Sequence, residues 1–236
     1  MTEHHHAQTD LIHAPRQAPQ YIETIQPPLF RASTIIFNST AHLFDRHWSD
    51  AYDYSYGTHG TPTTFTLGDN IAQLEGGTNC LLAPSGLSAI NLVNSTFLKS
   101  GDEVWIADNS YGPNLEHLKN LQERYGILLK IYNPVDADSF QPSEKAKLIW
   151  LEAAGSVTLE FPDLKKIVKK ARQANVLTAL DNTWGAGLAF NAFDFSDEHL
   201  AVDMTVHALT KYPSGGGDIL MGSVVTRDTH LHHQLY

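Results

Sequence analysis

The chain has 236 residues, with 16 basic and 26 acidic side chains, and its formal net charge is −10. This acidic balance argues against a nucleic-acid-binding protein, and no apolar stretch reaches the ~18 residues that a membrane-spanning helix needs. The single cysteine, Cys80, forms neither an internal disulfide nor a thiolate metal cluster, which indicates a reducing compartment. We therefore expect a cytoplasmic globular protein with no nucleic-acid or membrane partner.

The N-terminal part of the chain shows no sustained periodicity of apolar residues. Pro15 and the pair Pro27-Pro28 favour an extended backbone that packs poorly on itself. We expect residues 1–60 to form an arm that lies on another surface, such as a second subunit. Residues 61–236 then form the large domain.

Short apolar runs alternate with amphipathic stretches in the rest of the chain. The apolar runs predict seven strands: Asn79–Ala83, Glu103–Ala107, Ile127–Tyr132, Leu148–Leu151, Val176–Leu180, Met204–Val206 and Ile219–Val225. Helical spacing predicts three helices: Leu87–Phe97 behind Ser85 as N-cap, Leu115–Tyr125 before Gly126, and Leu164–Ala171 after Asp163. This alternation predicts an α/β fold in which helices cover both faces of a mainly parallel, seven-stranded sheet. Ligands bind beyond the carboxyl ends of the strands in such sheets, so the turns there are where a site is expected.

Three turns at this edge of the sheet carry residues that suit chemistry. Ser85-Gly86-Leu87 begins a helix, and it is either an anion site or an ordinary capped helix start. Asp181 follows a buried strand, and it is either a buried carboxylate that needs a cation or a metal, or a turn-forming residue. Lys211 follows the sixth strand, and it is either a Schiff-base nucleophile or a surface lysine.

The three turns together favour one cofactor. A phosphate site, a carboxylate and an amine at one edge of a parallel sheet are the groups that pyridoxal phosphate needs. A nicotinamide dinucleotide would need a glycine fingerprint after a strand, and the sequence has none. None of the 13 histidines has the spacing of a catalytic zinc site, so we expect no metal.

Several motifs occur in the same order as in one known enzyme family. They are Tyr56-Gly57 with Gly60-Thr61-Pro62, Leu74-Glu75-Gly76-Gly77, Ser85-Gly86-Leu87, Ser110-Tyr111, Leu151-Glu152 with Gly155-Ser156, Asp181-Asn182-Thr183-Trp184, and Thr210-Lys211-Tyr212 with Gly217-Asp218. In these motifs the chain resembles the Cys/Met-metabolism, or trans-sulfuration, family of pyridoxal-phosphate enzymes, over residues 56–225. The resemblance implies the large-domain fold of aspartate aminotransferase, known as fold type I.

The resemblance also implies catalytic roles for Lys211 and Tyr111 and a cofactor-binding role for Asp181. Lys211 would bond to the cofactor aldehyde as a Schiff base and later move protons between the substrate Cα and the leaving group. Asp181 would pair with the pyridinium nitrogen of the cofactor, and Tyr111 would stack on its ring.

Further residues would contact the cofactor by the same resemblance. The backbone of Gly86 and Leu87 and the Thr210 hydroxyl would hold the phosphate. Thr183 would also contact the cofactor. Tyr56 would reach the phosphate of a neighbouring subunit, which makes it part of a shared catalytic site and implies a homodimer or homotetramer.

The implied reaction is that of a carbon–sulfur lyase in methionine biosynthesis, namely β-elimination of cystathionine to homocysteine, pyruvate and ammonia. Gly155-Ser156 stands where γ-acting relatives have a threonine–asparagine–proline turn, and Ala208 stands where they usually have serine. Both differences favour β-elimination. The alternatives are a γ-acting relative (a cystathionine γ-synthase, a γ-lyase or an O-acylhomoserine sulfhydrylase) or a truncated fragment that binds the cofactor without activity.

Three features depart from the family pattern. Thr58-His59 stands where the family usually has an arginine that contacts the phosphate, and Gly215–Gly217 replaces a glycine–histidine–serine sequence. The chain also stops at Tyr236, before the C-terminal domain that supplies the substrate-carboxylate arginine in relatives. We therefore expect that substrate domain to be missing, and no residue is assigned its role.

Overall fold

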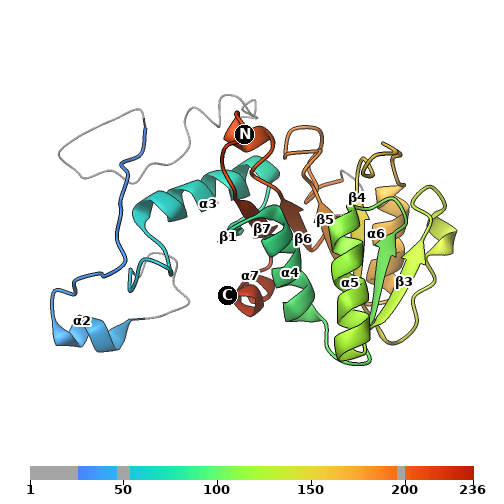
Figure 1. Ribbon diagram of the computed structural model, residues 1–236, viewed down its shortest axis with the longest axis horizontal. Helices are drawn as coiled ribbons and strands as arrows, with labels where there is room; N and C mark the ends of the chain where they lie inside the picture. The colour runs from blue at the N-terminus through green and yellow to red at the C-terminus, as the bar shows by residue number, and fades with distance from the viewer. Residues whose placement is uncertain (1–25, 47–53, 196–199) are drawn as a thin grey trace.

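The computed structural model describes residues 26–46, 54–195 and 200–236. Within these ranges seven strands form one sheet, with the spatial order β1-β7-β6-β5-β4-β2-β3 (Figure 1). The strands are β1 (Asn79–Ala83), β2 (Glu103–Ala107), β3 (Leu128–Tyr132), β4 (Ala146–Glu152), β5 (Leu177–Asp181), β6 (Met204–His207) and β7 (Gly222–Thr226).

All strands of the sheet except β7 run in the same direction. β3, β2, β4, β5 and β6 pair in parallel, whereas β7 lies antiparallel between β6 and β1. The segment between β6 and β7 holds one 3₁₀ turn, η2 (Tyr212–Ser214), and no helix that crosses back over the sheet, so β7 returns along its neighbour. The predicted mainly parallel, seven-stranded sheet is confirmed. β7 begins at Gly222 instead of Ile219, because Ile219 and Leu220 are exposed in the preceding loop.

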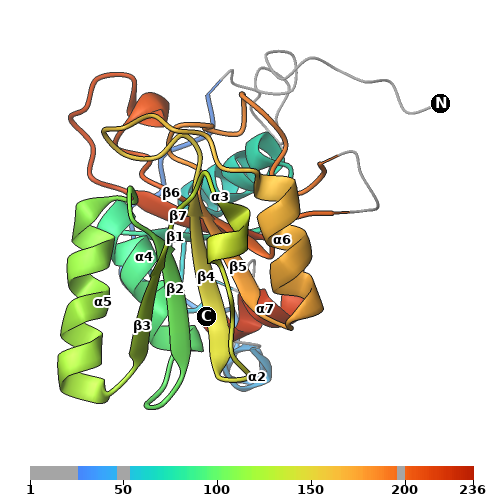
Figure 2. The same cartoon turned by 90° about the vertical axis from the view of Figure 1, so that its right-hand side faces the viewer.

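Helices cover both faces of the sheet, as predicted. They are α2 (Thr40–Asp45), α3 (Pro62–Glu75), α4 (Gly86–Phe97), α5 (Gly112–Tyr125), α6 (Leu164–Gln173) and α7 (Thr229–Leu235), with a 3₁₀ turn η1 at Ala137–Ser139. α4, α5 and α7 pack on the face that carries Val104 and Ile106, and α3 and α6 pack on the face that carries Trp105 and Ala107. Figure 2 shows α5 and α6 on opposite sides of the sheet. No helix in the described ranges is long and apolar enough to cross a membrane.

Local capping interactions define the ends of these helices. The Ser85 side chain accepts a hydrogen bond from Ser88 N–H at 3.0 Å, and Asp163 accepts one from Lys166 N–H at 3.0 Å. Gly126 ends α5 with a φ of 71°, in the left-handed region that glycine adopts without strain. The predicted starts of α4 and α6 and the predicted end of α5 are therefore confirmed.

Helix α3 has no counterpart among the predicted elements. Its first turn has a capping box between Thr61 and Thr64, and Pro62 follows the N-cap. Its buried face includes Thr66 and Gly68, which interrupt the apolar spacing that marks the other helices. Contacts with β1 and β7 therefore stabilise a helix that apolar periodicity alone does not predict.

Part of the expected N-terminal arm falls within the described residues, whereas residues 1–25 and 47–53 lie outside them. The arm lies along the start of α3, where Phe30 N–H donates to Thr63 Oγ1 at 2.7 Å. Ile36 is 91% exposed, so the arm presents apolar surface that is not covered by the described residues. The interface role of the arm stays a prediction.

The start of β7 lies against the start of α4. A Cβ atom on Gly222 would collide with the Ser85 carbonyl oxygen, so only glycine fits there. A Cβ atom on Gly86 would lie 2.6 Å from the Ala208 Cβ. These close approaches hold the first turn of α4 beside the ends of β6 and β7.

We predict that Gly222→Ala lowers the free energy of unfolding by about 1–3 kcal/mol, because the added methyl group meets backbone atoms. Gly112→Ala is the matched control, since a Cβ on Gly112 has no atom within 4 Å. It should change the stability by less than about 0.5 kcal/mol. Urea unfolding measures both variants, and a Gly222→Ala variant as stable as wild type would contradict this packing.

Candidate active site

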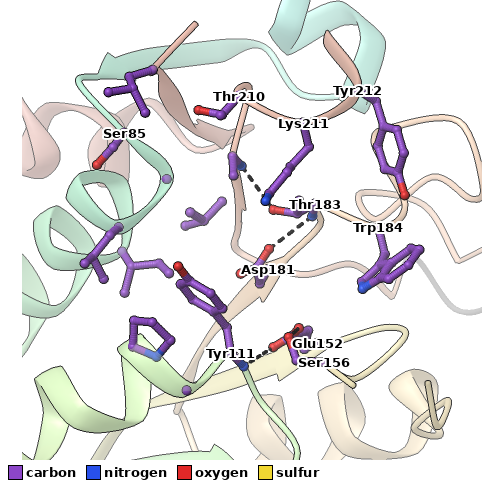
Figure 3. A pocket seen from close by; sticks show the side chains of 18 of the residues that line it. Ser85, Tyr111, Glu152, Ser156, Asp181, Thr183, Trp184, Thr210, Lys211 and Tyr212 are labelled. Atoms are coloured by element: carbon purple, nitrogen blue, oxygen red, sulfur yellow. Dashed lines mark hydrogen bonds between the residues drawn. The ribbon is translucent and has the colours of Figure 1, made fainter. Parts of the chain in front are cut away.

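A cavity of about 860 Å³ lies beyond the carboxyl ends of β4, β5 and β6 (Figure 3). The first turns of α4 and α5 form two of its walls. Its lining includes all predicted site residues except Tyr56, namely Gly86, Leu87, Tyr111, Asp181, Thr183, Thr210 and Lys211.

Asp181 is the last residue of β5, and its carboxylate lies in this cavity. It accepts a hydrogen bond from Thr183 N–H at 3.1 Å. Burial raises the pKa of Asp181, hydrogen bonds from Thr183 and the nearby His207 oppose this rise, and the Glu75 charge adds to it. Among the described residues Asp181 has no ion-pair partner, and no three His, Cys, Asp or Glu side chains are grouped to bind a metal ion. The carboxylate is therefore free to pair with a cationic ligand.

Glu152, to which the sequence motifs assign no role, lies beside Asp181. The two residues are direct neighbours in the parallel pairing of β4 and β5. Glu152 accepts hydrogen bonds from Ser156 Oγ at 2.6 Å and from Tyr111 N–H at 2.7 Å. Burial raises the pKa of Glu152 and the Asp181 charge adds to the rise, whereas the hydrogen bonds oppose it. Glu152 follows the apolar run Leu148–Leu151 just as Asp181 follows its own strand, so the same signal could have identified it.

Lys211 enters the cavity from the turn after β6 (Figure 3). Its backbone N–H donates to the Ala208 carbonyl at 3.0 Å, and η2 begins at the next residue. Within the described part of the chain, the Lys211 ammonium group forms no hydrogen bond or ion pair. An amine that shares a cavity with two carboxylates but has no fixed partner can reach an electrophilic ligand. This placement favours the nucleophile over a surface lysine.

The start of α4 presents free backbone amides to the cavity. Ser85 caps Ser88 N–H, and the N–H groups of Gly86 and Leu87 have no hydrogen-bond partner among the residues that the structure describes. The first amides of a helix attract anions, because they are unsatisfied and lie at the positive end of the helix dipole. These amides are free to bind an anion, and phosphate binding at this turn stays a prediction.

Two threonines brace the turns around Lys211. The Thr210 hydroxyl accepts a hydrogen bond from Met221 N–H at 3.2 Å, which links the turn after β6 to the loop before β7. The Thr183 hydroxyl accepts one from Ala208 N–H at 3.0 Å, which links the ends of β5 and β6. A direct contact of either hydroxyl with a phosphate stays a prediction.

The two predicted tyrosines lie in different places. Tyr111 lies across the cavity from Lys211, at the N-cap of α5 (Figure 3). Tyr56 instead lines a second cavity of about 860 Å³, together with His59 and Tyr236. Tyr56 is 46% exposed, and the His59 ring lies within hydrogen-bond distance of the Tyr236 hydroxyl. The predicted reach of Tyr56 into a neighbouring subunit stays a prediction.

The free groups of the first cavity match those of pyridoxal phosphate. The Asp181 carboxylate suits the protonated ring nitrogen, the amides of α4 suit the phosphate, and the Lys211 amine suits the aldehyde. The close approach of Gly86 to Ala208 brings these amides to the turn that carries Lys211. The fold and the site together match the class of α/β proteins that bind pyridoxal phosphate.

The chain belongs to the family of Cys/Met metabolism PLP-dependent enzymes, whose sequence model matches residues 8–236. It is 33% identical over 226 residues to the cystathionine beta-lyase of Haemophilus influenzae. This match covers 92% of the present chain and 55% of the Haemophilus protein. It is 32% identical over 225 residues to the L-alanine/L-glutamate racemase of Wolbachia pipientis wMel. That match covers 91% of the present chain and 55% of the racemase. The family and the cofactor predicted from the sequence are confirmed.

Solved structures share the fold. The crystal structure of cystathionine gamma synthase from Xanthomonas oryzae pv. oryzae, in complex with aminoacrylate and cysteine, matches with a TM-score of 0.82 and 27% identity. The match covers 98% of this chain and 57% of that chain. The present chain thus spans about half the length of the curated relatives it matches.

The raised pKa values of Glu152 and Asp181 predict how the stability of the cofactor-free protein depends on pH. A carboxyl group whose pKa rises on folding binds its proton more tightly in the folded state, so its ionisation opposes folding. This cost is absent below the ordinary carboxyl pKa. It grows as the pH rises towards the raised value, by about 1.4 kcal/mol per pH unit for each group.

We predict that Glu152→Gln removes the part of this free-energy cost that comes from ionising Glu152. The free energy of unfolding of the variant minus that of wild type should therefore be larger at about pH 7.5 than at about pH 5. Urea unfolding of the cofactor-free protein at both pH values measures the difference. Glu160→Gln, at an exposed position outside β4 and β5, is the matched control. A difference between Glu152→Gln and wild type that does not change with pH would contradict the raised pKa.

Proposed function

We propose that the protein is a carbon–sulfur lyase that cleaves cystathionine by β-elimination to homocysteine, pyruvate and ammonia. The observation that carries this proposal is the single cavity in which Lys211, Asp181 and the first amides of α4 meet. Similarity to the Haemophilus beta-lyase supports the choice of reaction. The proposed setting is methionine biosynthesis in the cytoplasm.

In this proposal the cavity holds the cofactor by three kinds of contact. The amides of Gly86 and Leu87 bind its phosphate, the Asp181 carboxylate binds its ring nitrogen, and the Tyr111 ring packs against its ring. When bound, pyridoxal phosphate withdraws electrons from the substrate Cα, so that a proton can leave that carbon.

Lys211 is the proposed proton carrier. Its amine takes the proton from the substrate Cα, and the bond between Cβ and sulfur breaks to release homocysteine as a thiolate. The ammonium group of Lys211 then returns the proton to the sulfur. Water hydrolyses the remaining three-carbon fragment to pyruvate and ammonia. The negative charge of Asp181 supports the first step because it keeps the ring nitrogen protonated.

The choice of β-elimination over γ chemistry rests on the loop after β4. Ser156, which replaces part of the turn typical of γ-acting relatives, donates to Glu152 in the cavity wall. The altered sequence therefore belongs to the site itself. Ala208, beside Gly86, is a second such difference. The alternative is a γ-acting enzyme, which would release 2-oxobutyrate from cystathionine instead of pyruvate.

Racemisation of an amino acid is a second candidate function. Lys211 and Tyr111 lie on opposite sides of the cavity, so one side chain can remove a proton from Cα while the other supplies one to the opposite face (Figure 3). The relative from Wolbachia is an L-alanine/L-glutamate racemase. Incubation with L-alanine and with L-glutamate, followed by chiral chromatography, tests this candidate by the appearance of the D-enantiomers.

We also propose that the enzyme works as a homodimer or homotetramer. The position of Tyr56 outside the cavity of its own chain supports a role in a neighbouring one. Residues 1–60 would then be the interface arm, and residues 61–236 the cofactor-binding domain. The arginine that binds the substrate carboxylate would belong to a separate substrate domain.

We predict that Lys211→Ala abolishes the visible absorbance that the cofactor acquires when it is bonded to a lysine amine, and slows cystathionine cleavage about a thousandfold or more. Borohydride should bleach this absorbance in wild type. Lys119→Ala is the matched control, because Lys119 is exposed and pairs with Glu116 on the surface of α5. A wild-type protein that stays colourless with the cofactor would contradict the assignment.

The product released from cystathionine tests the proposed reaction. We expect pyruvate, because β-elimination leaves a three-carbon fragment, and chromatography of the keto acid separates it from the four-carbon 2-oxobutyrate. Appearance of 2-oxobutyrate would show γ-elimination and contradict the proposal. A protein that binds the cofactor but releases neither acid would support the inactive fragment instead.

A further inference from the structure

Glu152 is a carboxylate of the cavity wall that the proposed reaction leaves unused. It ends β4 and is 5% exposed, so its oxygens need partners inside the protein. Its negative charge next to Asp181 adds to the cost of burying it. A buried carboxylate beside a second one destabilises the fold, which indicates that Glu152 has a role in the site beyond packing.

The two oxygens of Glu152 connect two walls of the cavity. Oε2 accepts from Tyr111 N–H at 2.7 Å, and Oε1 accepts from Ser156 Oγ at 2.6 Å (Figure 3). Such short distances are typical of hydrogen bonds that a charged group strengthens. Tyr111 is the N-cap of α5, and its own N–H group is held by the hydrogen bond to Glu152.

The same strand also holds the first turn of α5 at a second point. Trp150 Nε1 donates to Asn94 Oδ1 at 2.8 Å, and Asn94 Nδ2 donates to Asn114 Oδ1 at 3.2 Å. Both asparagines are buried. β4 therefore fixes α5 through this network and, two residues further along the strand, fixes the preceding Tyr111 peptide through Glu152. The Tyr111 ring, which lines the cavity, follows the position of that peptide.

We propose that Glu152 is a positioning residue that sets the place of the Tyr111 ring against pyridoxal phosphate and ties the Ser156 segment to the same wall. The inference rests on the proposed function only in requiring the bound cofactor. It predicts that an acceptor at position 152 matters for how the cofactor is held, whether or not that acceptor is charged.

Visible circular dichroism of the protein loaded with pyridoxal phosphate tests this role, because the signal per bound cofactor depends on how its ring is held. Glu152→Ala should reduce that signal at least about twofold and weaken cofactor binding in equilibrium dialysis about tenfold, since Tyr111 N–H loses its acceptor. Glu152→Gln should keep both within about twofold, because its amide oxygen can accept from Tyr111 and its amide N–H can donate to Ser156. Wild-type signal and affinity in Glu152→Ala would overturn the proposal.

Glu103→Ala is the matched control for the loss of a buried carboxylate. Glu103 lies at the amino end of β2, away from the cavity, and accepts from Trp105 Nε1 and Ser143 Oγ. Its loss should lower the stability but leave the dichroism and the cofactor affinity unchanged. Equal losses of dichroism in both alanine variants would overturn the proposal. If Glu152→Ala does not fold, Glu152→Met fills similar space without an acceptor, and the same outcomes apply to it.

A double-mutant cycle with Tyr111→Leu shows whether Glu152 acts through the tyrosine ring. In that background Glu152→Ala should change the cofactor affinity by less than about twofold. An undiminished effect would overturn the proposal. These measurements need no turnover of cystathionine. A protein that binds the cofactor but does not cleave cystathionine would refute the proposed function and would still test the role of Glu152.

Discussion

The negative charge at the carboxyl ends of β4 and β5 is the constraint on which the rest of the cavity depends. Glu152 and Asp181 end these two strands side by side, and burial raises the pKa of both. Like charges in such a place need hydrogen bonds or a cation to compensate them. Tyr111 and Ser156 donate to Glu152, whereas Asp181 keeps its carboxylate for a positively charged ligand.

The opposite wall of the cavity supplies groups of the other polarity. The first amides of α4 and the Lys211 amine lie there, brought together by the close approach of Gly86 to Ala208 and of Gly222 to Ser85. A ligand with an anionic end and a cationic ring therefore matches the cavity from both sides. Pyridoxal phosphate has this distribution of charge.

Much of this arrangement is predictable from the sequence, because buried parallel strands are short apolar runs and their following turns carry the site. This pattern predicts Asp181 and Lys211 as site residues, and the structure brings them into one cavity. Apolar runs do not predict the direction of β7. That direction depends on the segment after Lys211, which connects β6 to β7 without a crossover helix and so makes the two strands antiparallel. Glu152 follows an apolar run just as Asp181 does, but its role depends on its contacts with Asp181, Tyr111 and Ser156, which only the structure shows. The surroundings of Tyr56 depend on contacts distant in the chain, which local pattern does not determine.

The protonation state of the cofactor ring nitrogen tests the central claim most directly. Nitrogen NMR of the protein loaded with ¹⁵N-labelled pyridoxal phosphate reports whether that nitrogen carries a proton. Pairing with Asp181 predicts a protonated nitrogen at neutral pH in wild type and an unprotonated one in Asp181→Asn, because the amide no longer stabilises the positive charge. An unprotonated nitrogen in wild type, or a nitrogen that stays protonated in Asp181→Asn, would contradict the account.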